Sequence, residues 1–294
     1  MPLRADLKSI VWHRKDTELP KSPPAQESWR MGMGDDGPSG WPGSDWIEDL
    51  LLQREGPEVY ERWVRGQLPW DSEEVQGAWQ AWGNLLTPGD KGLAKRALIT
   101  DHRGPTDGNG LLFGKDACML EHQGSFAPFF YSENSDKDVD FTDSAELLPG
   151  GPYRVKAHEV TGDFAALFSD SGRARNLLRE LASESRQRDW ADSAGVFSAN
   201  NKVRPGDGGV EHEIADRLTS KDTARCLDAS DVMLPAVRDA FYEAILLTLT
   251  RYSEGEGPGS IKGILENVDK VQEAQAKNSV IQSEVCSTPQ QPPL

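Results

Sequence analysis

Cysteine is scarce in this sequence, with three residues among 294, and they lie far apart at Cys118, Cys226 and Cys286. No two of them form a C-x-x-C pair, which argues against the thiolate metal sites and redox pairs that use this spacing. The spacing favours three free thiols and leaves one long-range disulfide as the alternative.

Basic residues are also few, because 32 Lys and Arg residues stand against 48 Asp and Glu residues, a net charge of −16. A surface of this sign repels the phosphates of nucleic acid and the headgroups of an anionic membrane. We therefore expect no nucleic-acid partner. Neutral small molecules and positively charged protein surfaces remain as classes of partner.

Long apolar runs are missing as well. Ala244–Leu247 is the longest wholly apolar run in its helix, far below the ~20 residues that span a bilayer. Near the start, Asp6 and Lys8 interrupt any apolar region that could serve as a secretory signal. We expect no direct insertion into a membrane and, in the sequence as written, no signal peptide.

Signatures of catalysis, metal binding and nucleotide binding are lacking too. The five histidines match no H-E-x-x-H spacing, and Glu211-His212-Glu213 is interpreted as a solvated turn. There is no P-loop, and we expect no cofactor and no metal. A glycoside hydrolase would need two carboxylates flanking a glycosidic bond, and nothing singles out such a pair. Catalysis is therefore the minor alternative.

The length suffices for two domains, and strand-like segments alternate with helices, which favours an α/β fold. Helices are expected from Ser44, Pro57, Ser72, about Asp163, Pro235 and Ser260. Strands are expected at Ser9–Trp12, Ala97–Thr100 and Ala117–His122, and a surface loop at Glu133–Glu146. Residues 272–294 lose periodicity and predict a disordered tail.

Tryptophan is the most informative residue type, because eight of the nine fall in the first third of the chain. An indole can stack on the C–H face of a sugar ring while its N–H donates a hydrogen bond. Trp46, Trp63, Trp79 and Trp82 stand at helical spacing and are predicted to be core residues. Trp12, at a strand end, and Trp41, in the glycine-rich loop of residues 32–43, are predicted to face a cleft.

The segment around Trp41 reads Gly40-Trp41-Pro42-Gly43-Ser44-Asp45-Trp46-Ile47-Glu48-Asp49. It resembles the G-W-P-G-T-D-W-I-E-D segment of bacterial extracellular sugar-binding proteins of ABC importers, especially the α-glucoside branch. Further segments resemble this family in order. They are Pro2–Trp12 (P-x-R-x-x-x-K-S-L-V-W), Gly56–Gly66 (G-P-E-x-Y-D-x-W-V-x-G), Cys118–Phe126 (C-Y-x-H-R-Q-x-S-F), Gly195–Asn200 (G-G-F-x-S-P-N), Asp228–Met233 (D-x-S-D-x-M-P) and Ile264–Asp269 (I-L-x-x-I-D).

The resemblance implies a two-lobed α/β protein of the type II periplasmic-binding kind, which closes on a sugar between its lobes. By this resemblance, residues 1–122 would hold the remainder of the N-terminal lobe and interlobe segments. Residues 123–271 would form a mainly helical C-terminal lobe with hinge-crossing segments. The implied partners are a mono- or oligosaccharide and the permease subunits of the importer. The implied protein is a monomer, periplasmic or extracellular, and not an enzyme.

Carried over position by position, Trp41 and Asp45 are the strongest sugar contacts, one stacking and one accepting hydroxyl hydrogen bonds. Weaker candidates are Trp12 and Arg4, for which strand packing and a surface charge are the alternatives. Asp228 and Asp231 could bind ligand or could form a turn that caps the helix near Pro235.

The sequence departs from the family in three places. Glu121-His122-Gln123 stands where the family has His-Arg-Gln, so a forked arginine is lost and the candidate His122 offers fewer donors. A Pro-rich stretch replaces a helix between Asp16 and Gly32. The segment Pro2–Trp12 opens this chain, whereas it lies inside the family's proteins. We therefore expect an incomplete, N-terminally truncated first lobe, with a non-functional remnant as the alternative to a working binder.

Overall fold

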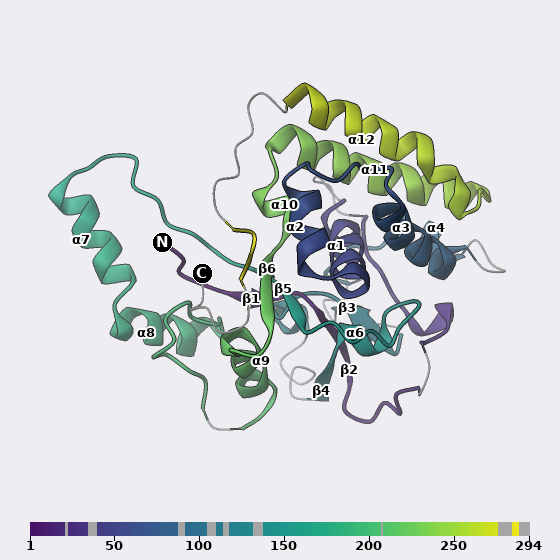
Figure 1. The fold of residues 1–294 in the computed structure, drawn as a ribbon. Helices are drawn as coiled ribbons and strands as arrows, with labels where there is room; N and C mark the ends of the chain where they lie inside the picture. Colours follow the sequence, from purple (N-terminus) through teal and green to yellow (C-terminus); the bar gives the residue numbers. More distant parts are fainter. Residues whose placement is uncertain are drawn as a thin grey trace.

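The computed structural model describes residues 1–20, 23–34, 40–87, 92–104, 110–113, 118–131, 138–206, 208–275 and 284–287 (Figure 1). The α-helices are α1 (Trp41–Glu55), α2 (Pro57–Val64), α3 (Glu73–Leu86), α4 (Gly92–Ile99), α5 (Gly110–Phe113), α6 (Ser144–Leu147), α7 (Gly172–Leu181), α8 (Glu184–Ala194), α9 (Val210–Thr219), α10 (Ala229–Val232), α11 (Pro235–Glu254) and α12 (Lys262–Gln275). Three short 3₁₀ helices join them: Gln26–Ser28, Ala127–Phe130 and Pro258–Ile261.

The strands form two small sheets, which confirms the α/β class. The strands are β1 (Asp6–Leu7), β2 (Ile10–Arg14), β3 (Leu120–His122), β4 (Val139–Asp143), β5 (Ala157–Thr161), β6 (Ala224–Leu227) and β7 (Cys286–Ser287). One sheet has the order β1-β5-β6-β7, in which β5 and β6 are parallel and the outer pairs antiparallel. The other has the antiparallel order β3-β2-β4. Successive residues at Lys8 and Ser9 connect the two sheets.

A layer of helices packs against one side of these sheets (Figure 1). α1 lies innermost and contacts β5, α2, α3 and α11, while α4 and α12 both pack on α11. Helices before and after residue 122 thus share one layer. The domain boundary predicted at residue 122 stays a prediction; α11, which lies beyond it in the sequence, contacts α1 and α4.

Tryptophans fill the centre of the helical layer. Trp46, Trp63, Trp79 and Trp82 are each at most 1% exposed, which confirms their prediction as core residues. Trp63, Trp70 and Trp79 surround Phe241 of α11, with ring centroids 4.8–6.1 Å apart. Edge-on aromatic contacts of this kind stabilise a core beyond the area they bury.

α1 begins three residues earlier than predicted. Gly40 occupies the N-cap position, and Trp41 and Pro42 are the first two helical residues, where a proline's missing N–H costs nothing. The Ser44 hydroxyl donates to the carbonyl of Trp41 and does not cap the helix. The early start makes Trp41 a helical residue at the end of α1. Residues 35–39 of the predicted glycine-rich loop lie outside the described residues.

Two local predictions are wrong. The strand expected at Ala97–Thr100 is the end of helix α4, whose Leu93, Ala94 and Ala97 are buried on one face against α11. The surface loop expected at Glu133–Glu146 contains β4, because Val139 and Phe141 alternate inward and pair with β2. Residues 133–137 of that loop lie outside the described residues.

The expected tail and thiols also need correction. α12 runs to Gln275, and Val285, Cys286 and Ser287 are buried where β7 pairs with β6. A disulfide joins Cys226 to Cys286, so the alternative to three free thiols holds, and Cys118 alone is a free, buried thiol. Residues 286–287 are thus ordered by pairing with β6, an inner strand of the sheet, although their sequence shows no periodicity. Residues 276–283 and 288–294 lie outside the described residues.

The predicted helix from about Asp163 to Trp190 is two helices, α7 and α8. All ten residues of α7 are at least partly exposed, and Leu177 and Leu181 are 59% and 38% exposed. Phe164 and Phe168, just before α7, are 64% and 100% exposed. The apolar side chains of α7 and of the segment before it are therefore largely open to solvent among the described residues. No helix in the described part of the chain is long and apolar enough to cross a membrane.

Candidate functional site

Four rings gather at the first turn of α1, and we call Trp41, His102, Phe126 and Phe130 the aromatic shelf. The ring of Trp41 lies 4.7 Å from His102 and 6.0 Å from Phe126 between centroids. Phe130 contacts both His102 and Phe126. Trp41, Phe126 and Phe130 are half-buried, so part of the shelf is open to solvent. The chain places three of the four rings in loops or at helix starts, where backbone turns aim them to one side.

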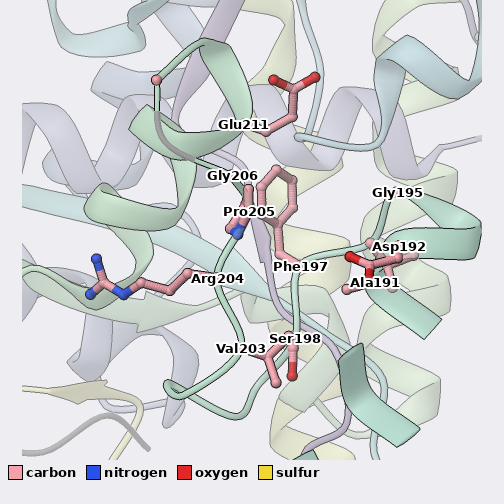
Figure 2. Close-up of a pocket in the computed structure, with 12 residues that line it drawn as sticks. Ala191, Asp192, Gly195, Phe197, Ser198, Val203, Arg204, Pro205, Gly206 and Glu211 are labelled. Carbon is pink, nitrogen blue, oxygen red and sulfur yellow. The ribbon is translucent and has the colours of Figure 1, made fainter. Parts of the chain in front are cut away.

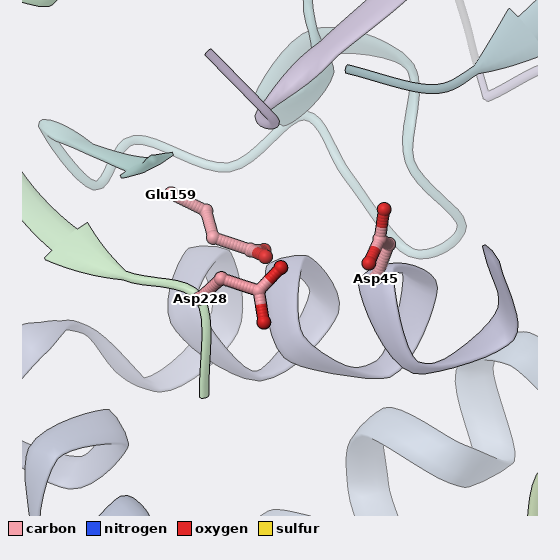
Figure 3. A group of neighbouring side chains, drawn as sticks. All are labelled: Asp45, Glu159 and Asp228. Atoms are coloured by element: carbon pink, nitrogen blue, oxygen red, sulfur yellow. The ribbon is translucent and has the colours of Figure 1, made fainter. Parts of the chain in front are cut away.

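A buried polar network lies beneath the shelf. The Lys8 ammonium lies 2.5 Å from Asp45 of α1 and 3.3 Å from Asp228, which follows β6. Asp45, Asp228 and Glu159 of β5 point their carboxylates toward a common centre (Figure 3), with oxygens within 4.8 Å of one another. Each of these carboxylates is at most 3% exposed. A cluster of this kind could hold a metal ion, but the Lys8 ammonium already supplies the cation to two of its three members.

Burial and crowding set the charges in this network. Burial lowers the pKa of Lys8, but Asp45, Asp228 and Glu159 outweigh it, so the net pKa lies well above its ordinary value. Burial raises the pKa of Asp45 to about 6, although Lys8 lowers it. Burial, reinforced by neighbouring carboxylates, raises the pKa of Glu48 and of Glu159 well above the usual range. One ammonium cannot neutralise four buried carboxyls, so the site favours the protonated forms of Glu48 and Glu159 more than water does.

A second arm of the network fixes the middle of α1. Nε2 of His122 lies 2.8 Å from Asp49, and both side chains are fully buried. The Ser9 hydroxyl donates to Asp49 at 2.7 Å and accepts from the backbone N–H of Glu159 at 2.7 Å. His122 also packs on Trp46 at 4.7 Å between rings. This arm has no exposed atom to offer a ligand, so its role is to hold α1, β2, β3 and β5 together.

The structure brings four of the predicted site residues together: Trp41, Asp45, His122 and Asp228. Of these, Trp41 alone is open to solvent, and Asp45 is committed to Lys8. Asp228 caps α10 by accepting a hydrogen bond from the N–H of Asp231. The predicted cap was for the helix near Pro235, which is the next helix, α11. α11 has Leu234 at its N-cap.

The remaining candidates lie elsewhere or at the margin. Trp12 is 1% exposed and donates its indole N–H to the carbonyls of Gln123 and Gly124. It lines a cavity that the shelf does not line. Arg4 pairs with Asp6 at 2.7 Å beside β1. Asp231 is exposed and accepts a hydrogen bond from Thr161.

Sequence reasoning missed three residues that build the site: Lys8, Phe126 and Glu159. Lys8 and Phe126 lie inside segments that resemble the sugar-binding family, so their position in those segments was the available signal. Glu159 lies in β5 without a motif. Its meeting with Asp45 and Asp228 depends on the pairing of β5 with β6, which no local pattern reveals.

The larger cavities do not open onto the shelf. One, of about 390 Å³, lies between α8 and α9, with Phe197 at its centre and Asp192 and Glu211 beside it (Figure 2). An adjoining cavity of about 390 Å³ shares Phe197 and Glu211 and reaches Ser125 and Phe129. Neither is lined by a residue of the shelf.

Comparison with known proteins gives relatives of one kind. No protein-family model matches the chain. The sequence is 32% identical over 210 residues to the alpha-glucosides-binding periplasmic protein AglE of Rhizobium meliloti (strain 1021), covering 61% of this chain and 43% of that protein. It is 28% identical over 262 residues to the osmoprotective compounds-binding protein GgtB of Synechocystis sp. (strain ATCC 27184 / PCC 6803 / Kazusa), covering 80% of this chain and 60% of that protein.

Solved structures share the fold at low sequence identity. A chitin oligosaccharide binding protein aligns with a TM-score of 0.65 and 14% identity, covering 95% of this chain and 71% of that one. Maltose-bound MalE3 of T. maritima aligns with a TM-score of 0.58 and 16% identity, covering 93% and 72%. This chain thus spans less than two thirds of the length of both sequence relatives.

The relatives are named for binding and not for catalysis, in agreement with the expectation that the chain is not an enzyme. The chain is thus similar in sequence to proteins named for binding α-glucosides and osmoprotective compounds, and it shares the type II α/β fold of solved sugar-binding proteins.

Proposed function

We propose that this chain is the substrate-binding component of an ABC importer and holds a carbohydrate against the aromatic shelf. The observation that carries the proposal is the position of Trp41: an indole at the first turn of α1, half-buried, above a charged network that fixes the helix. Such a platform can stack on the C–H face of a sugar ring. Asp45 was predicted to accept hydrogen bonds from sugar hydroxyls. Because its carboxylate is 3% exposed and paired to Lys8, we propose instead that it supports the aromatic shelf from beneath.

Polar groups near the shelf suit sugar hydroxyls. The half-buried Tyr242 packs its backbone against Gly40, and its hydroxyl lies 3.1 Å from that of Ser230. Asp231, one residue further, is exposed and can accept hydroxyl hydrogen bonds. An α-glucoside or a related oligosaccharide is the proposed ligand, because the relative at 32% identity is named for α-glucosides.

We also propose a periplasmic or extracellular location, delivery to a membrane permease and a monomeric state. The disulfide between Cys226 and Cys286 supports the location, since such bonds persist in oxidising compartments and are rare in the cytoplasm. The relatives are named as periplasmic or secreted proteins.

A glycoside hydrolase is the less favoured function. Its two carboxyls must face a cleft that admits a glycosidic bond and a water molecule. Asp45, Asp228 and Glu159 are buried together, and among the described residues they line none of the cavities given above.

Replacing Trp41 with alanine is expected to weaken sugar binding strongly. Losing the stacked indole should cost about 2 kcal/mol, or roughly a 30-fold rise in Kd. Isothermal titration with sucrose, trehalose and glucosylglycerol measures the change. Trp190→Ala is the matched control, because Trp190 is half-buried in α8 and away from the shelf.

Two results would contradict the proposal. A flat titration with a cooperatively folded wild-type chain would favour the non-functional remnant. Turnover of any of these glycosides would favour the hydrolase.

A further inference from the structure

Lys8 belongs to both the polar network and the aromatic shelf. Its side chain is 6% exposed, and its ammonium is held between Asp45 and Asp228. The same ammonium lies 5.2 Å from the ring centroid of Trp41 and 5.6 Å from that of Phe126. Both distances are within the range of a cation–π interaction.

The backbone on either side of Lys8 is anchored as firmly as the side chain. The N–H of Lys8 donates to the carbonyl of Glu159 at 2.9 Å. The N–H of Leu7 donates to the Ser125 hydroxyl at 3.1 Å, and the N–H of Ser125 donates to the carbonyl of Leu7 at 2.8 Å. The chain at Lys8 is thus tied to β5 and to the residue that precedes Phe126.

We propose that Lys8 is the positioning residue of the sugar site, holding the rings of Trp41 and Phe126 in one arrangement through its buried ammonium; this rests on the proposed function. Trp41 and Phe126 are 85 positions apart in the sequence, and the ammonium is a contact common to both. A desolvated cation attracts ring faces more strongly than a hydrated one. Asp45 and Asp228 keep the cation charged and stationary, so they act on the ligand through Lys8.

A purely structural ion pair would hold α1 to the sheets without influencing the rings. Removing the charge of Lys8 from a chain that still folds distinguishes the two roles. The surroundings of Trp41 change if Lys8 positions the rings and stay the same if it is only a structural ion pair. Lys8→Met keeps the length of the side chain and removes the charge, whereas Lys8→Arg keeps the charge.

The experiment measures both the rings and the ligand. The difference between the fluorescence spectra of the chain and of its Trp41→Phe variant isolates the emission of Trp41. Lys8→Met is expected to change the wavelength and intensity of this difference spectrum and to raise the Kd for the bound glucoside about tenfold. Lys8→Arg should retain the spectrum and most of the affinity.

The controls separate failure of this inference from failure of the proposed function. Lys262→Met removes a lysine from an exposed i,i+4 pair with Glu266 and should leave both readouts unchanged. If Lys8→Met does not fold, Asp45→Asn removes the nearer anchor and should change the difference spectrum in the same direction. An unchanged spectrum in a folded Lys8→Met or Asp45→Asn variant overturns the inference. Absence of sugar binding by the wild type overturns the proposed function, while the spectrum still tests Lys8.

Discussion

Reduction of the disulfide between Cys226 and Cys286 is expected to lower the free energy of unfolding by about 4 kcal/mol. The bond spans 60 positions of sequence, and closing a loop of that length removes much of the conformational entropy of the unfolded chain. It also holds β7 on β6, so its loss would expose Val285, which is 1% exposed in the folded chain. Urea unfolding with and without a reductant measures the difference.

Two variants make this measurement specific. Cys118→Ala removes the free thiol, whose pKa burial raises to about 12, and should leave the effect of reductant intact. The double variant Cys226→Ala with Cys286→Ala should be insensitive to reductant and should match the reduced chain. A change of less than about 1 kcal/mol on reduction would show that β7 is held by its backbone pairing alone.

Raising the pH from 6.5 to 8 is expected to destabilise the fold by about 2 kcal/mol through Glu121 alone. Burial raises the pKa of this carboxyl to about 8, against an ordinary value of 4.5, although a hydrogen bond from Tyr131 lowers it. Because the pKa is higher in the folded state, the stabilisation is fully present below pH 4.5. It is lost at about 1.4 kcal/mol per pH unit as the pH rises toward 8.

Glu121→Gln tests this assignment, because an amide of the same shape can still accept from the Tyr131 hydroxyl, which lies 3.0 Å from Glu121. The variant should lose part of the pH dependence between 6.5 and 8 and be more stable at pH 8 than the wild type. The pKa values of Glu48 and Glu159 are also raised, so part of the pH dependence of stability should persist in the variant. Working above pH 6.5 leaves out most of the contribution of His158, whose pKa burial lowers from 6.5. Identical pH profiles for the two chains would refute the role of Glu121.

Motifs and helix signals could be interpreted without the structure. The ten residues from Gly40 to Asp49 predicted a relationship that the comparisons support. Pro57, Ser72 and Pro235 marked helix starts that the structure confirms. These features depend on neighbours within a few positions: a proline at N1, a hydroxyl that caps free N–H groups, or indoles at helical spacing.

Predictions failed where distant segments decide the outcome. Val139–Asp143 has the composition of a polar loop but becomes a strand because β2 offers an edge. Gly92–Ile99 ends in β-prone residues but stays helical because α11 covers its apolar face. Intrinsic preference is weak, and tertiary packing overrides it in both cases.

The sequence by itself determined the α/β class and the tryptophan core, because these follow from local pattern. Only the tertiary structure decided that Asp45 faces Lys8 and not solvent, that Trp12 is buried, and that Cys226 meets Cys286. The reason is physical: burial, charge pairing and disulfide formation depend on which strands become neighbours, and the pairings of β5 with β6 and of β6 with β7 join residues 60 to 67 positions apart.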